Sequence, residues 1–224
     1  VTKSTLDEAD KVALYDSVTG KMVLSDALTK EYVTKIQESL YSYGVEFDQN
    51  QSTTTLYRIG NQELHLTLPV QSGMKRCLVL DNGTVNYYTH PNNTLMKEDG
   101  VTPSVLDGTD GQLMVEVPEH WRKFTTLTDE KFEVRLSMVE IAGYHKVAKF
   151  YVSAFEAAVH RPTNKLSSVI NLSPDYRGGN NNAAWDGAAN TFLGRPASSI
   201  SLTNFRNYAR NRGAKWNVLP YEQY

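Results

Sequence analysis

The chain has 224 residues, with 23 basic and 25 acidic side chains and a formal net charge of −2. A chain of this length buries roughly 70% of the surface it exposes when unfolded, so its core needs no disulfide or metal. The near-neutral charge excludes a general attraction to nucleic acid or to an anionic membrane. The single cysteine, Cys77, excludes an intrachain disulfide and a cysteine-based zinc site, and no apolar run is long enough to predict a membrane span. We therefore expect neither nucleic acid nor a membrane as a partner.

The first 50 residues form an acidic segment, with nine acidic and five basic side chains. Apolar and polar residues alternate on both sides of the Gly-containing stretch 16–20, which predicts a short hairpin. The alternating apolar residues are Val12, Leu14, Met22 and Leu24.

Residues 29–43 change to a helical period, and we expect an amphipathic helix there, capped by Thr29 and ended by Gly44. Its apolar residues are Val33, Ile36, Leu40 and Tyr43. This spacing suits a helix docked on a sheet and also a short coiled-coil seam between copies. We expect residues 1–50 to serve attachment or oligomerisation, ahead of a second domain over residues 51–224.

From residue 56 to residue 150 the pattern is mostly that of β-strands. Alternating apolar and polar residues predict strands at 64–68 and 132–138, and short apolar runs predict strands at 77–80, 85–88 and 114–117. Asp81-Asn82-Gly83 is a strong hairpin turn, and the Pro- and Gly-interrupted stretch 91–111 predicts a long surface loop. Several closely spaced strands with few helices predict an α+β protein.

The last third of the chain combines an Asn- and Gly-rich stretch with a basic helix. The composition of residues 171–190 cannot fill a core and predicts a loop. Ser201 is expected to cap a helix with Leu202, Phe205 and Ala209 on its inner face and Arg206 and Arg210 on its outer face. Residues 176–215 hold six basic side chains and one acidic one, so the positive charge is concentrated here.

Catalytic and cofactor signatures are missing from the sequence. The five histidines are scattered, and no metalloprotease, nucleophile-elbow or phosphate-binding motif is present. The acidic loop 99–110 lacks the spacing of a calcium-binding loop. We expect no enzyme, no metal and no cofactor, although a catalytic triad could still assemble in space.

The remaining chemistry is that of recognition. Asn offers a donor and an acceptor, Trp a flat apolar face and Arg a planar fork, a set that suits hydroxyl-rich ligands such as glycans. The candidate ligand-binding residues are Asn180, Asn181, Asn182, Trp185, Arg206, Arg210 and Trp216. The structural alternative is that Asn and Gly form tight turns, Arg ties down loop carbonyls and Trp belongs to the core.

Four segments, in this order, resemble a family of tailed-bacteriophage and prophage virion proteins that is common in gut bacterial genomes. They are residues 111–118 (GQLMVEVP), 150–157 (FYVSAFEA), 166–169 (LSSV) and 203–213 (TNFRNYARNRG) with Trp216. The resemblance covers roughly residues 56–224. It implies a C-type-lectin-like fold, akin to formylglycine-generating enzymes and to retroelement-diversified tropism proteins. It also implies a virion head or tail appendage that displays a recognition surface, often as a trimer.

The chain departs from that family in two respects. Family members continue past the tryptophan segment, so the resemblance implies that further residues or a partner chain complete the fold. The Glu-Pro-Asn and Trp-Asn-Asp signature of calcium-dependent lectins is missing, and Cys77 lies far from the position that formylglycine-generating chemistry requires.

The expected function is therefore that of a non-enzymatic virion protein that binds a host surface glycan or protein. The alternative is an architectural virion protein whose lectin-like domain binds only neighbouring subunits. A glycan-cleaving enzyme would need a pair of carboxylates in a cleft. We interpret the two carboxylates within the family-like segments, Glu116 and Glu156, as structural.

Overall fold

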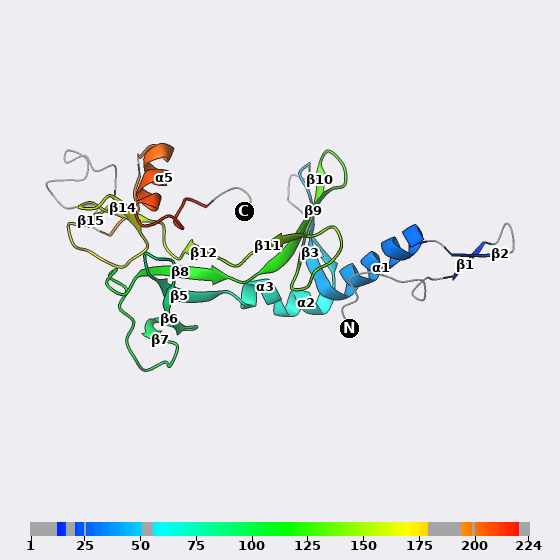
Figure 1. Cartoon of the computed structure of the whole chain (residues 1–224), viewed down its shortest axis with the longest axis horizontal. Coiled ribbons are helices and arrows are strands. Elements are labelled where there is room, and N and C mark those ends of the chain that lie inside the picture. The colour runs from blue at the N-terminus through cyan, green and yellow to red at the C-terminus, as the bar shows by residue number, and fades with distance from the viewer. Residues whose placement is uncertain are drawn as a thin grey trace. The chain divides into compact units, whose positions relative to one another are not determined.

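The computed structural model describes residues 13–16, 21–24, 26–50, 56–178, 194–198 and 200–219 (Figure 1). Antiparallel sheets dominate this part of the chain, together with a few short helices and one longer one. The α+β class expected from the sequence is confirmed.

The N-terminal hairpin and helix form close to where the sequence places them. Strands β1 (Ala13–Asp16) and β2 (Lys21–Leu24) pair antiparallel. Helix α1 (Asp26–Tyr41) begins three residues before Thr29 and ends before Gly44. Gly44 belongs to the next strand, where a Cβ atom would lie 2.0 Å from the carbonyl oxygen of Val134. The glycine is therefore needed for close strand packing, and the predicted role as helix terminator is wrong.

The chain divides into two compact units, which we call unit 1 (Val1–Ser72 with Glu119–Ala148) and unit 2 (Gly73–Pro118 with Lys149–Tyr224). The division expected at residue 50 falls between two strands that pair with each other in unit 1, β3 (Ser42–Asp48) and β4 (Leu56–Gly60).

Unit 1 contains a five-stranded antiparallel sheet. Its order is β11 (His145–Val147), β9 (His120–Thr126), β10 (Lys131–Ser137), β3 (Ser42–Asp48) and β4 (Leu56–Gly60). Helices α2 (Gln62–Thr67) and α3 (Pro69–Ser72) follow β4. They shield Tyr43, whose hydroxyl donates to Oε1 of Gln71 at 2.6 Å and accepts from the amide of Val70 at 3.0 Å.

The strand predicted over residues 64–68 is wrong, because α2 occupies this stretch. The side chain of Asn61 accepts a hydrogen bond from the amide of Glu63 and caps the helix. Leu64 and Leu68 are also four residues apart, so the same apolar residues fit one helical turn.

Unit 2 contains a second five-stranded antiparallel sheet. Its order is β12 (Phe150–Ser153), β8 (Gln112–Val117), β5 (Lys75–Val79), β6 (Val85–His90) and β7 (Asn93–Lys97). The predicted turn at Asp81-Asn82-Gly83 joins β5 to β6, and Gly83 has the positive φ that such a turn requires. Strand β7 lies within the stretch 91–111 that was predicted as a loop. The side chains of Asn93 and Asp99 accept hydrogen bonds from nearby backbone amides and form tight turns. Turn-forming residues are also typical of loops, so the composition did not reveal the strand between them.

Buried apolar clusters lie on both faces of this sheet. Cys77, Val79 and Met114 form one buried cluster, and Leu78, Leu106 and Leu113 form another. A smaller sheet follows, with the order β14 (Lys165–Ser167), β13 (Ala158–His160) and β15 (Tyr176–Arg177), and helix α5 (Leu202–Arg210) contacts β14.

Candidate functional site

Helix α5 is positioned by a cap at one end and by apolar packing along one side. The hydroxyl of Ser201 accepts a hydrogen bond from the amide of Asn204 at 3.3 Å, as the sequence predicts. Ala209 is buried, and Phe205 and Tyr208 are half-buried. Leu202 was expected on this inner face but is exposed.

The opposite side of the helix is polar. We define the outward face of α5 as four of its exposed residues, which lie on one side of the helix: Thr203, Arg206, Asn207 and Arg210. Arg206 and Arg210 lie one turn apart, so their guanidinium groups can reach the same ligand. Within the part of the chain that the structure describes, the guanidinium group of neither arginine forms a hydrogen bond or an ion pair. The structure therefore brings together two of the predicted binding residues and leaves their donors available.

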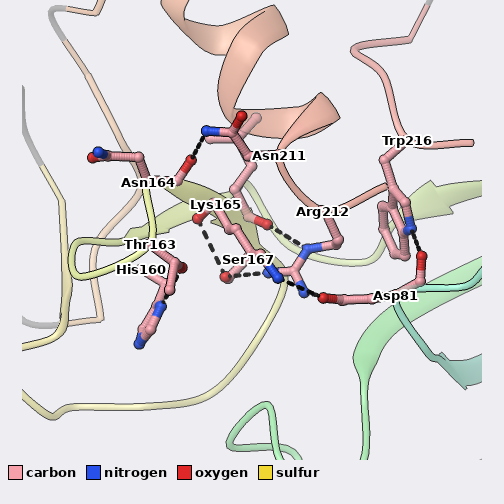
Figure 2. A network of polar contacts seen from close by, with 10 residues as sticks. Asp81, His160, Thr163, Asn164, Lys165, Ser167, Asn211, Arg212 and Trp216 are labelled. Carbon is pink, nitrogen blue, oxygen red and sulfur yellow. Dashed lines mark hydrogen bonds and ion pairs between the residues drawn. The ribbon is translucent and has the colours of Figure 1, made fainter. Parts of the chain in front are cut away.

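The end of α5 is fixed by the buried side chain of Arg212 (Figure 2). Its guanidinium donates from Nε to the carbonyl of Leu166 at 2.9 Å and from Nη2 to Oγ of Ser167 at 2.8 Å. Its Nη1 donates to Oδ1 of Asp81, in the turn between β5 and β6. We call this set of contacts the α5 anchor. It ties the helix to strand β14 and to the second sheet at once.

Two further contacts complete the α5 anchor. Lys165 pairs with Oδ2 of Asp81 at 2.8 Å, and Nδ2 of Asn211 donates to the carbonyl of Asn164 at 3.0 Å (Figure 2). The close approach of the two segments also explains Gly213, because a Cβ atom there would lie 2.7 Å from the carbonyl oxygen of Asp81.

Asp81 is held in its charged form. Burial alone would raise the pKa of its carboxyl group, but the hydrogen bonds and charges of Lys165 and Arg212 outweigh that effect, and the pKa lies below its ordinary value. Both carboxylate oxygens thus have cationic partners. Asp81 therefore serves as a fixed negative charge that holds α5 in place.

Trp216 belongs to this anchor. Its indole N–H donates to the carbonyl of Asp81 at 2.8 Å, and its ring packs against the cluster of Cys77, Val79 and Met114. The guanidinium of Arg212 lies 5.5 Å from the ring centroid, within the range of a cation–π contact. These contacts give Trp216 a role in the scaffold, which is the structural alternative that the sequence left open for it.

The other candidate residues, Asn180, Asn181, Asn182 and Trp185, lie outside the described residues. Asp81 was predicted only as part of a hairpin turn, and the sequence assigned no site role to Lys165, Ser167 or Arg212. The only local signal at Arg212 is its position between the end of a helix and a glycine. No pattern in the sequence connects it to Asp81.

A second polar cluster in unit 2 surrounds Glu116. Its Oε2 atom accepts hydrogen bonds from the hydroxyls of Tyr88 at 2.9 Å and Tyr151 at 3.0 Å, and Lys149 lies 3.4 Å away. Burial would raise the pKa of Glu116, but these partners outweigh it and the pKa lies below its ordinary value. A carboxylate without a proton near neutral pH does not suit general-acid catalysis. The cluster fits the structural role that we assigned to Glu116.

Within the described residues, no three His, Cys, Asp or Glu side chains converge to form a potential metal site. No helix in the described ranges combines the length and the apolar character needed to cross a membrane.

Comparisons with protein-family models, with curated proteins and with solved structures found no match to this chain.

Proposed function

We propose that the protein is a non-enzymatic virion appendage protein, part of a head or tail fibre, that binds a host surface glycan or protein. In this proposal unit 2 provides a C-type-lectin-like body and α5 provides the binding surface. The observation that supports it best is the outward face of α5, where Arg206 and Arg210 are exposed on a helix whose C-terminal end is held by the α5 anchor.

The chemistry of this face favours an anionic or hydroxyl-rich ligand. A guanidinium group offers a planar fork of donors that matches a carboxylate or phosphate, and charged hydrogen bonds are stronger than neutral ones. The hydroxyl of Thr203 and the amide of Asn207 lie on the same face and add partners for sugar hydroxyls. A helix that is already anchored loses little entropy when it binds. Several copies on one particle would strengthen weak binding by avidity.

The second candidate is an architectural virion protein that binds only neighbouring subunits. The observation in its favour is an apolar row on α1, formed by Tyr32, Ile36 and Leu40, all of which are exposed. Exposed apolar surface of this kind marks interaction sites.

A binding screen separates the two candidates. The labelled full-length chain is applied to an array of bacterial surface polysaccharides and to intact cells of gut bacterial isolates. The Arg206→Ala and Arg210→Ala variants should each bind the positive ligands about tenfold more weakly, since a charged hydrogen bond contributes about 1.5–3 kcal/mol.

The matched control is Arg58→Ala, which removes an exposed arginine from unit 1 and causes the same change in net charge. Binding to no array ligand and to no cell would favour the architectural candidate.

A further inference from the structure

Helix α1 turns its polar side toward its own sheet. The carboxylate of Glu38 is largely buried and pairs with Lys123 of β9 at 2.8 Å, and Thr34 and Gln37 are half-buried. Val33 is half-buried beside these polar residues, whereas three other apolar residues of α1 are exposed. We call them the α1 stripe: Tyr32, Ile36 and Leu40, with 60%, 40% and 50% of their surfaces exposed. Residues spaced by four lie on one face of a helix, so the stripe is continuous.

The sheet of unit 1 has an apolar patch that is also incompletely covered. The ring of Phe132 stacks on Phe47 at 5.4 Å and lies 5.6 Å from the ring of Phe124. Phe124 and the neighbouring Leu56 are 57% and 60% exposed. We call these four residues the phenylalanine face. Helices α2 and α3 shield the sheet near Tyr43, at the other end of β3.

The α1 stripe cannot cover the phenylalanine face of its own chain. Adjacent residues of a strand point to opposite faces of a sheet. Glu38 of α1 binds Lys123, whereas the phenylalanine face contains the next residue, Phe124. Helix α1 therefore lies on the side opposite the phenylalanine face, and it is held there because Tyr41 is followed directly by the first residue of β3.

We propose that the α1 stripe of one copy packs on the phenylalanine face of a second copy of this chain. Each copy supplies both halves of a helix-on-sheet layer, and each half remains exposed to solvent within the described part of its own chain. Such layers are the usual way in which a helix and a sheet bury their apolar faces. An isolated helix of this length is marginally stable in water, so α1 gains stability from the contact.

The contact can be made reciprocally, with each copy covering the other. Five of the seven residues in one layer are 40–60% exposed. Because a whole Tyr or Phe side chain covers about 150–250 Å², burying these exposed fractions in two reciprocal layers approaches the ~1,200 Å² at which stable interfaces begin. The inference rests on the proposal that several copies of this protein assemble on one particle. It does not involve the outward face of α5.

The first test measures the mass of the full-length chain by sedimentation over a range of concentrations. Tyr32→Ser changes the α1 stripe, and Tyr41→Ser makes the same change on the same helix, at a residue 50% exposed but on another side. We expect self-association of the unmodified chain, at least tenfold weaker association for Tyr32→Ser and Phe124→Ser, and less than twofold change for Tyr41→Ser. A monomeric unmodified chain, or equal effects of the two tyrosine changes, would overturn the proposal.

The second test identifies the contact by cross-linking. Chains with Ile36→Cys are mixed with chains with Phe124→Cys under mild oxidation, while the native Cys77 stays unreactive because it is fully buried. We expect a disulfide between the two kinds of chain. A disulfide only between two Ile36→Cys chains would show a helix–helix contact and contradict the proposed layer.

These results are independent of ligand binding. A monomeric chain that still binds cells through α5 would contradict this inference and leave the proposed function intact. A chain that self-associates but binds no cell would contradict the proposed function and leave this inference intact.

Discussion

Arg212 and Asp81 are 131 positions apart in the sequence, and their ion pair joins the end of α5 to the turn between β5 and β6. The guanidinium group is almost fully buried, whereas the carboxylate is partly open to solvent. The pair therefore works as part of the scaffold that presents the outward face of α5. Changes to this scaffold should therefore alter stability, and changes to the outward face should alter ligand binding.

Replacing Arg212 by Ala should destabilise unit 2 by about 2–4 kcal/mol, because it leaves the buried partners of the guanidinium without a donor. Denaturant unfolding monitored by tryptophan fluorescence measures the change. The control Arg210→Ala removes an exposed arginine from the same helix and should shift the free energy of unfolding by no more than about 0.5 kcal/mol. Equal effects of the two changes would contradict the role of the anchor.

The contribution of Asp81 should depend on pH. A carboxyl group whose pKa is lower in the folded chain than in the unfolded chain stabilises the fold above its unfolded pKa of about 3.9. That stability is lost as the pH falls through the folded pKa. The free energy of unfolding of Asp81→Asn should therefore lie below that of the unmodified chain at pH 7, and the gap should narrow below about pH 4. If the difference in the free energy of unfolding between the two chains stays constant down to pH 2, the charge of Asp81 does not contribute to stability.

Trp216 should affect stability and leave ligand binding unchanged. Trp216→Phe removes the N–H that binds the carbonyl of Asp81, and we expect a loss of about 1 kcal/mol in the free energy of unfolding. The affinity of the folded variant for array ligands should equal that of the unmodified chain. A loss of affinity without a loss of stability would restore the stacking role predicted from the sequence.

Two glycines with positive φ should respond differently to the same change. A Cβ atom at Gly111 would lie 2.7 Å from the backbone oxygen of Val79, whereas at Gly83 its nearest contact is the flexible side chain of Lys215. Gly83→Ala should cost about 1 kcal/mol through its left-handed backbone. Gly111→Ala should cost at least about 1 kcal/mol more, because strand β8 or β5 must shift. Thermal unfolding of the two variants measures the difference, and similar melting temperatures would contradict the close contact.

Local sequence patterns predicted the elements whose causes are local. The Asp81-Asn82-Gly83 turn, the alternation over residues 132–138 and the Ser201 cap each depend on a few neighbouring residues, and each is found in the structure. Alternation failed at residues 64–68, because three leucines at every second position also fit a short helix and Asn61 supplied its cap.

The α5 anchor could not be predicted, because its contacts join residues from separate strands and turns. The residue types of Arg206 and Arg212 are the same, and they are six positions apart. Only the folded chain shows that one is exposed and that the other is buried against Asp81. The sequence identified the basic segment correctly, but it did not separate the arginines that hold the helix from those that remain available.

The most direct test of the proposed function is the affinity of the double variant Arg206→Ala/Arg210→Ala for the bacterial isolate that the unmodified chain binds best. We expect cell binding at least a hundredfold weaker, with the free energy of unfolding unchanged within about 0.5 kcal/mol. Undiminished binding by a correctly folded double variant would contradict the claim that the outward face of α5 recognises the host.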